Sequence, residues 1–143
     1  MKYFLGSDHA GLKLKEFVKD FLKARNLEFE DLGTYDSQRV DYPDFARKVC
    51  EKVLENPNSE GILSCGSGIG MSISANKFKN IRAALCHNEY SAKMAKKHNN
   101  ANVLCIGEKV SGLGVIEDIL SSWCEAEFEE GRHGQRVDKI DSL

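Results

Sequence analysis

The chain has 143 residues, of which 41% are hydrophobic and 29% are charged, a composition typical of one globular domain with its own apolar core. Its formal net charge of −2 excludes a general attraction to nucleic acid or to anionic membranes, and no apolar run approaches the ~20 residues of a membrane-spanning helix. We therefore expect a cytoplasmic protein without a signal peptide, a nucleic-acid partner or a membrane partner.

Strands and helices alternate along the first half of the chain. Short apolar runs predict strands over 2–6 and 27–32, and apolar residues at helical spacing predict a helix over 10–25. A second helix is predicted to begin with Pro43, which suits a first helical turn, and to end at the Asn-Pro-Asn segment 56–58.

The same alternation continues in the second half. We expect strands over 61–64, 81–86 and 102–106, with a glycine loop and a helix after the first of them. Asn88 is placed to cap the next helix, and the apolar positions of 115–123 predict the last long helix.

Five apolar strands alternating with helices predict an α/β fold, a Rossmann-like three-layer αβα sandwich built on a five-stranded parallel sheet. We expect residues 1–143 to form one domain. The charged segment 125–143 is too polar to add to its core, so we expect a C-terminal arm, with a short helix, that contacts a partner subunit. Right-handed crossovers place the carboxyl ends of all strands at one edge, where we expect these residues to meet: Asp8, His9, Cys65, His87 and Gly107.

Cys65 stands between a predicted strand and a glycine loop, in the segment EGILSCGSGIG at 60–70. Backbone N–H groups of such a loop can hold a phosphate or an oxyanion, and they favour the thiolate form of a neighbouring cysteine. Cys65 is therefore a candidate base or nucleophile, although its position also suits a buried cysteine that only fills space. A dinucleotide fingerprint fits less well, because Met71 stands where Gly or Ala is required and the loop follows the third strand.

The remaining cysteines are interpreted as small buried residues. Their number, together with Cys65, is odd and no C-x-x-C pair is present, which indicates free thiols in a reducing compartment. Histidines and cysteines are not grouped at metal-ligand spacing, so we expect no metal. The four residues are Cys50, Cys86, Cys105 and Cys124.

Several polar residues are further candidates for chemistry. His98 stands at a helix end before the fifth strand, either as a general acid or base or as an ordinary exposed histidine. Asp8 and His9 form a carboxylate–imidazole pair that can orient a substrate hydroxyl. Arg132 and Arg136 are one helical turn apart, which suits either a single bound phosphate or a solvated basic patch.

Six segments together resemble the RpiB/LacAB family of sugar-phosphate isomerases over essentially the whole chain. Several independent motifs in the same order make this resemblance far more specific than one glycine loop. The segments are GSDHAG at 6–11, DYPDFA at 41–46, CGSGIGMSISANK at 65–77, YSA at 90–92, HNNANVL at 98–104 and GRHGQR at 131–136.

The resemblance implies an aldose–ketose isomerase without cofactor or metal, which interconverts ribose 5-phosphate and ribulose 5-phosphate through an enediolate in the pentose phosphate pathway. It implies that Cys65 is the base that moves a proton between carbons 1 and 2. The other implied roles are stabilisation of the enediolate oxygens by Ser67 and the amides of Gly66, Gly68, Ile69 and Gly70; ring opening by His98 with Asp8; sugar binding by Asn99 and Tyr42; and phosphate binding by His9, Lys109, Arg132 and Arg136.

Two positions depart from patterns within the family. Lys109 stands where relatives can have arginine, so it keeps the charge but loses the two-pronged geometry. Met71 stands where a second branch of the family has a glutamate base, which places the chain with the cysteine branch.

The family also forms dimers, often paired into tetramers, with active sites made from two subunits. The resemblance therefore implies a homodimer or homotetramer. Two other functions stay open: a hexose 6-phosphate isomerase of the same family, acting on galactose 6-phosphate or allose 6-phosphate, and a non-catalytic nucleotide- or phosphate-binding module.

Overall fold

The computed structural model describes residues 1–143, and it alternates strands and helices as the sequence predicts. All five strands are parallel and lie in the order β2-β1-β3-β5-β4. The elements are β1 (Lys2–Ser7), a 3-10 turn (His9–Gly11), α1 (Leu12–Ala24), β2 (Glu28–Asp31), α2 (Tyr42–Glu55), β3 (Ser59–Cys65), α3 (Ile69–Ala75), β4 (Ala83–Leu85), α4 (Glu89–Asn99), β5 (Val103–Gly107), α5 (Leu113–Glu125) and α6 (Arg132–Asp141).

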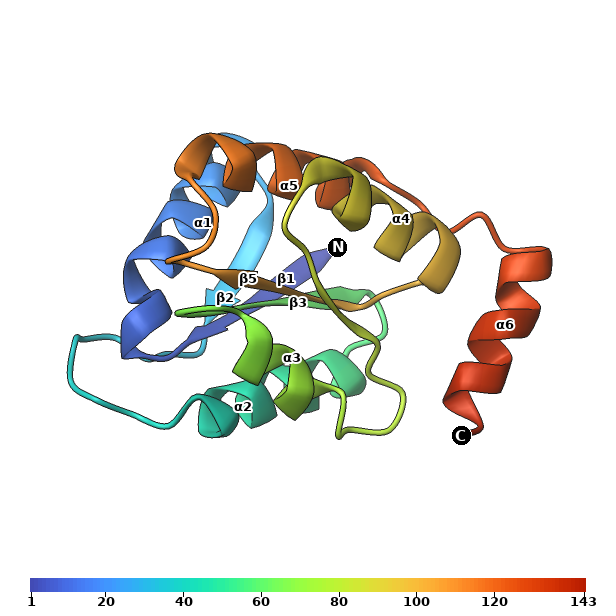
Figure 1. Ribbon diagram of the computed structural model, residues 1–143, viewed down its shortest axis with the longest axis horizontal. Helices are drawn as coiled ribbons and strands as arrows, with labels where there is room; N and C mark the ends of the chain where they lie inside the picture. Colours follow the sequence, from blue (N-terminus) through green and yellow to red (C-terminus); the bar gives the residue numbers. More distant parts are fainter.

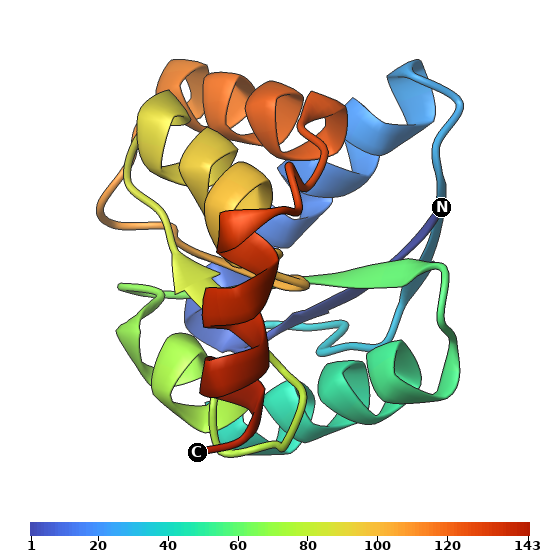
Figure 2. The same ribbon diagram turned by 90° about the vertical axis from the view of Figure 1, so that its right-hand side faces the viewer.

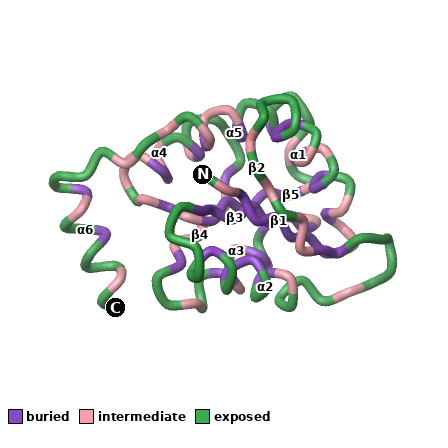
Figure 3. The backbone as a smooth tube through the Cα atoms, turned by 180° about the vertical axis from the view of Figure 1, so that it is seen from behind, coloured by how far each residue is buried: buried purple, intermediate pink, exposed green.

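The sheet lies between two layers of helices, which confirms the predicted three-layer αβα sandwich (Figure 1). Helices α1, α4 and α5 cover one face, where Trp123, Leu104 and Leu22 belong to a core cluster of 17 buried residues. Helices α2 and α3 cover the other face over a second cluster of 12, which includes Cys65 and Met71. The buried central strands run through the middle of the molecule (Figure 3).

Local sequence signals set several helix boundaries. Pro43 lies in the first turn of α2, where its missing N–H costs no helical hydrogen bond. Asn88 accepts a hydrogen bond from Ser91 N–H at 2.8 Å and forms a capping box at the start of α4. Both predictions are confirmed.

The fourth strand is shorter than the predicted 81–86 and spans only Ala83–Leu85. Side-chain amide oxygens accept hydrogen bonds from the backbone N–H groups at the start of the strand and just before it. Asn102 Oδ1 accepts from Arg82 N–H and Asn76 Oδ1 accepts from Ala83 N–H, both at 2.8 Å. The backbone there is thus satisfied without a longer strand ladder.

The C-terminal segment forms a helix that is partly docked on its own chain. His133 and Val137 are buried on α6, and Arg82 forms an ion pair with Asp141 at 3.0 Å near the helix end. Figure 2 shows α6 across the edge of the molecule where the strands begin. The prediction of a polar arm is therefore refined: one face of α6 packs against α4 and the other is exposed. None of the helices is long and apolar enough to cross a membrane.

Candidate active site

The loop after β3 folds back over the thiol of Cys65. Gly68 N–H donates a hydrogen bond to Cys65 Sγ at 3.1 Å, and Gly68 adopts φ of 79°, a left-handed conformation that glycine accepts without strain. Cys65 is only 4% exposed and also belongs to the core beside α2 and α3. The sulfur therefore lies at the boundary between the apolar core and the partly exposed loop of Gly66, Ser67 and Gly70.

Two of the four loop amides that were expected to face the substrate are instead hydrogen-bonded within the loop. Gly68 N–H is directed at the thiol, and Ile69 N–H donates to Ser67 Oγ at 3.2 Å. These two amides therefore stabilise the loop and hold the sulfur in place instead of facing a substrate. The Gly68 donor fixes the position of Sγ at the start of the loop.

The turn after β1 packs directly against the end of β3. Asp8 is buried and accepts Gly11 N–H at 3.0 Å, while Ser64 Oγ donates to Gly11 O at 2.9 Å. A Cβ at Gly11 would lie 2.5 Å from the Ser64 backbone, so only glycine permits this approach. The turn that carries Asp8 is therefore packed against the strand end that carries Cys65.

The end of β5 completes this carboxyl edge. Glu108 N–H donates to Cys65 O and Lys109 N–H to Gly66 O, both at 3.0 Å. A Cβ at Gly107 would lie 2.5 Å from the Ser67 backbone. The exposed Lys109 thus lies beside the glycine loop.

Tyr42 and His9 lie at the same edge. The Tyr42 ring is so close to Gly70 that a Cβ there would lie 2.5 Å from it. His9 Nδ1 accepts Val40 N–H at 3.2 Å, so the neutral His9 ring carries its proton on Nε2 and can donate from that atom.

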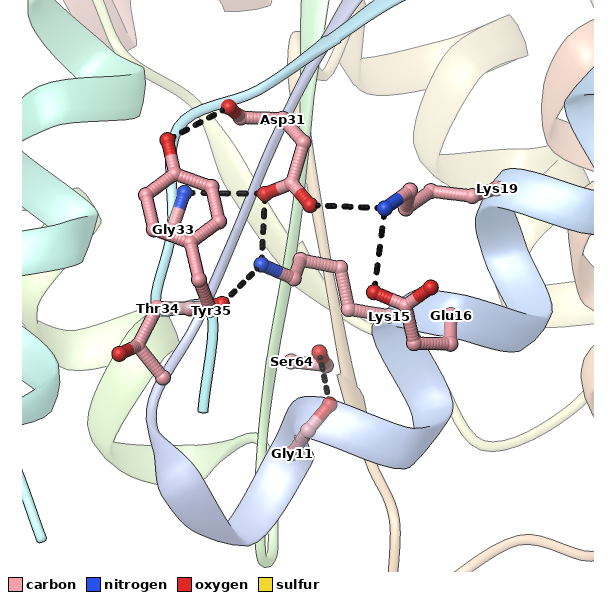
Figure 4. Close-up of polar contacts among 9 residues, drawn as sticks. All are labelled: Gly11, Lys15, Glu16, Lys19, Asp31, Gly33, Thr34, Tyr35 and Ser64. Carbon is pink, nitrogen blue, oxygen red and sulfur yellow. Dashed lines mark hydrogen bonds and ion pairs between the residues drawn. The ribbon is translucent and has the colours of Figure 1, made fainter. Parts of the chain in front are cut away.

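A buried lysine holds the turn that leads to these residues (Figure 4). Lys15 is 1% exposed, and its ammonium binds Asp31 Oδ1 at 2.6 Å and the carbonyl oxygen of Thr34. Burial lowers the pKa of Lys15 more than Asp31 raises it. Burial would raise the pKa of Asp31, but hydrogen bonds from Lys15, Gly33 N–H and Lys19 outweigh it and lower that pKa.

Four of the expected site residues lie at the opposite, amino edge of the sheet. His98 and Asn99 end α4 before β5 begins, and Arg132 and Arg136 are exposed on α6. The seven residues of β3 rise about 3.3 Å each, so about 20 Å of sheet separates this group from Cys65. Asp8 therefore does not assist His98 of the same chain. This corrects the expectation that the two residues of one chain act together in ring opening.

Two neighbours of His98 were not singled out from the sequence. His133 stacks on the His98 ring with centroids 4.1 Å apart, and Glu129 Oε1 lies 3.7 Å from His98 Nε2. The motif GRHGQR contains His133, but only its two arginines were interpreted as site residues. No local signal links Glu129 to a histidine 31 positions earlier in the sequence.

The remaining thiols are confirmed as mainly buried, with Cys124 intermediate. Burial raises the pKa of Cys50 to about 12 and that of Cys86 to about 11, and it also raises those of Cys105 and Cys124. Thiols so hard to ionise are poor bases, which leaves Cys65 as the candidate among the cysteines.

A family model described as Ribose/Galactose Isomerase matches residues 3–140 of the chain. The chain belongs to this family. It is a sugar-phosphate isomerase, as the six motifs indicated.

Individual members of the ribose/galactose isomerase family are similar over their full length. Ribose-5-phosphate isomerase B of Escherichia coli is 43% identical, covering 99% of this chain and 95% of that protein. The structure of ribose-5-phosphate isomerase B from Clostridium thermocellum is 50% identical with a TM-score of 0.97, covering 99% of this chain and 96% of that one. The enzyme of Mycoplasma genitalium, solved with bound ribulose 5-phosphate, is 41% identical with a TM-score of 0.94, covering 99% and 94%.

Proposed function

We propose that this isomerase interconverts ribose 5-phosphate and ribulose 5-phosphate, with Cys65 as the base. The observation that carries the proposal is the Gly68 N–H donor on Cys65 Sγ, at the carboxyl edge of a fold whose relatives are named ribose-5-phosphate isomerase B. The ribulose 5-phosphate bound to the Mycoplasma genitalium relative supports the choice of a pentose phosphate.

In the proposed reaction Cys65 thiolate removes the proton on carbon 2 of the open-chain aldose. The electron pair forms the C1–C2 double bond of an enediolate, and the carbonyl oxygen becomes negative. The hydroxyl of Ser67 and the loop amides not used internally stabilise that oxygen, an effect worth about 3–4 kcal/mol for one donor in oxyanion sites. The proton of the carbon-2 hydroxyl passes to the negative oxygen on carbon 1, the C2–O2 bond becomes the new carbonyl, and the thiol returns its proton to carbon 1, which gives the ketose.

Phosphate binding uses charges from both sheet edges, so we infer that the site is completed by a second copy of the chain. His9 Nε2–H and Lys109 lie beside the thiol, whereas Arg132 and Arg136 lie about 20 Å away across the sheet. In a homodimer, or in a tetramer of two such pairs, the partner supplies both arginines together with His98 and Asn99. The exposed face of α6 is the arm that reaches the neighbour.

Replacing Cys65 tests the assignment. Cys65→Ala is expected to abolish exchange of the carbon-bound proton with deuterated solvent, while ribose 5-phosphate still binds because the phosphate ligands are unchanged. The measurement is proton NMR of substrate in heavy water, with binding followed by calorimetry. Full exchange in the variant would exclude Cys65 as the base. Binding without isomerisation in the wild type would favour the phosphate-binding module instead.

A hexose 6-phosphate is the second candidate, because the matching family model covers galactose as well as ribose isomerases. Comparison of kcat/KM for ribose 5-phosphate, galactose 6-phosphate and allose 6-phosphate decides between them. We expect the pentose to be preferred, and a strong preference for either hexose would overturn the choice.

A further inference from the structure

Two histidine rings from different helices are stacked at the amino edge of the sheet. The centroids of His98 and His133 are 4.1 Å apart and their planes differ by 9°. His98 lies in the last turn of α4 and His133 in the first turn of α6, and the end of α4 meets the start of α6 in Figure 2. The two side chains differ in access to solvent: 40% of His98 is exposed and only 9% of His133.

The two rings lie at opposite kinds of helix end, which makes them unequal as bases. His98 lies beside the carbonyl groups that end α4, whereas the N–H groups at the start of α6 disfavour a protonated His133. Desolvation, followed by the positive charges of His98 and Arg132, lowers the pKa of His133, and Glu129 opposes the change. The lowered pKa keeps the buried His133 ring a neutral neighbour of His98.

The charged groups that face this pair come from α4, α6 and the segment between α5 and α6. Glu129 lies across both rings, with Oε1 3.7 Å from His98 Nε2 and Oε2 3.9 Å from His133 Nε2. These distances exceed those of direct hydrogen bonds, so the carboxylate acts through its charge. Lys97 lies 3.5 Å from the same carboxylate, and Arg132 and Arg136 add positive charge from α6.

Two histidines and a glutamate have the composition of a metal site, but their arrangement does not fit one. A metal bound by an imidazole nitrogen lies close to the plane of that ring. The two stacked planes are nearly parallel, so they do not meet within bonding distance of both nitrogens. The geometry instead describes a stacked pair that faces one carboxylate.

We propose that His133 is a positioning residue for His98: it covers one face of the His98 imidazole, fixes the orientation of the ring and leaves the other face open to substrate. The inference rests on the proposed function and on the role that the family resemblance implies for His98, which is to open the sugar ring. Because α6 also carries Arg132 and Arg136, this helix then positions the ring-opening group and the phosphate ligands as one unit.

Ring opening is needed for only one of the two sugars. In furanose ribose 5-phosphate the C1–O4 bond breaks, the proton leaves the hydroxyl on carbon 1, and O4 gains a proton, so the step has no net proton change. Ribulose 5-phosphate is already open, because the oxygen that would close its five-membered ring carries the phosphate. A defect in His98 positioning should therefore slow conversion of the aldose and spare proton exchange on the ketose.

Three variants separate this role from simple packing. His133→Ala removes the cover from the His98 ring, whereas His133→Phe keeps a flat ring that can stack. Asp141→Ala is the matched control, because it breaks the ion pair with Arg82 at the far end of α6 and leaves the stack untouched.

We expect His133→Ala to lower kcat for ribose 5-phosphate about tenfold, with KM and the deuterium exchange into ribulose 5-phosphate each changed less than about twofold. His133→Phe should recover most of that loss. Asp141→Ala should weaken both reactions together, mainly through KM, because the arginines bind the phosphate common to both sugars. The inference would be overturned if His133→Ala converted ribose 5-phosphate at the wild-type rate. It would also be overturned if the variant lost conversion and deuterium exchange equally.

An NMR titration of the histidine ring protons tests the pair without any substrate. His98→Asn should raise the pKa of His133 because it removes a positive neighbour, and Glu129→Gln should lower it because it removes a negative one. An unchanged His133 titration in both variants would also overturn the inference. Absence of all isomerisation and exchange in the wild type would overturn the proposed function instead, and the titration would still show whether the two rings act as a pair.

Discussion

Lys15 shows how a residue far from the chemistry can determine the shape of the site. Its buried ammonium binds Asp31 at the end of β2 and the Thr34 carbonyl in the following turn. That turn leads to Val40, whose N–H fixes the proton of His9, and then to Tyr42 over the glycine loop. Lys15 therefore connects a packing interaction to two proposed ligands of the sugar phosphate.

Lys15→Met should destabilise the fold by about 3–5 kcal/mol, because it leaves a partly buried carboxylate without its main partner. We also expect a higher KM for the sugar phosphate, since the turn that leads to Val40 and Tyr42 loses its anchor. Urea unfolding and steady-state kinetics measure the two effects.

Lys19→Met is the matched control for this prediction. Lys19 binds the same Asp31 carboxylate at 3.1 Å, but it is 20% exposed and should contribute no more than about 1 kcal/mol. Equal destabilisation by the two variants would show that the buried position of Lys15 has no special importance.

At the scale of single residues, the site residues that directly follow a strand could be predicted from the sequence. Asp8, His9 and Cys65 were predictable because a parallel sheet brings its carboxyl ends together, whereas Lys109 was expected only from the family resemblance. The contacts between Lys15 and Thr34 and between His98 and His133 could not be predicted, because each contact depends on how two elements pack. Local patterns contain no information about such contacts.

Glycines set the closest approaches between elements. Gly107 ends β5 against the backbone of Ser67, and a Cβ there would lie 2.5 Å from it. Neither backbone segment can move freely, because Glu108 and Lys109 are hydrogen-bonded to the same loop. The end of β5 and the glycine loop therefore form one rigid unit.

Gly107→Ala should displace the loop that holds the thiol, so we expect a large loss of kcat and a lower midpoint of thermal unfolding. Gly114→Ala is the control, because nothing lies within 4 Å of a Cβ there and alanine favours a helix by up to about 1 kcal/mol. Assays and thermal unfolding of both variants give the comparison. Normal activity in Gly107→Ala would mean that the loop does not need this close contact.

At the scale of elements, the alternation of strands and helices, the parallel sheet and the capped start of α4 were all predictable from periodicity and capping residues. The length of β4 was not, because Asn76 and Asn102 take over its backbone donors from outside the strand. The docking of α6 was also missed. Its polar sequence hides two buried positions, His133 and Val137, that matter only once α4 is beside it.

For the whole molecule, the decisive feature is the separation of the expected site residues into two groups at opposite sheet edges. One group surrounds Cys65 and the other surrounds His98, with about 20 Å of sheet between them. A single chain cannot bring both groups to one sugar phosphate. We therefore expect two chains to form each site, with a different half supplied by each chain.

Complementation between two inactive variants tests this expectation most directly. Cys65→Ala and His98→Asn are co-expressed with different tags and the isomerase activity of the mixed preparation is measured. With random pairing, half of the dimers are mixed and each contains one intact site, so about a quarter of wild-type activity should return. Cys65→Ala paired with Asp8→Asn damages the same half twice and should recover nothing. An inactive first mixture in which mixed dimers are shown to form, or recovery in the second, would contradict an active site shared between two chains.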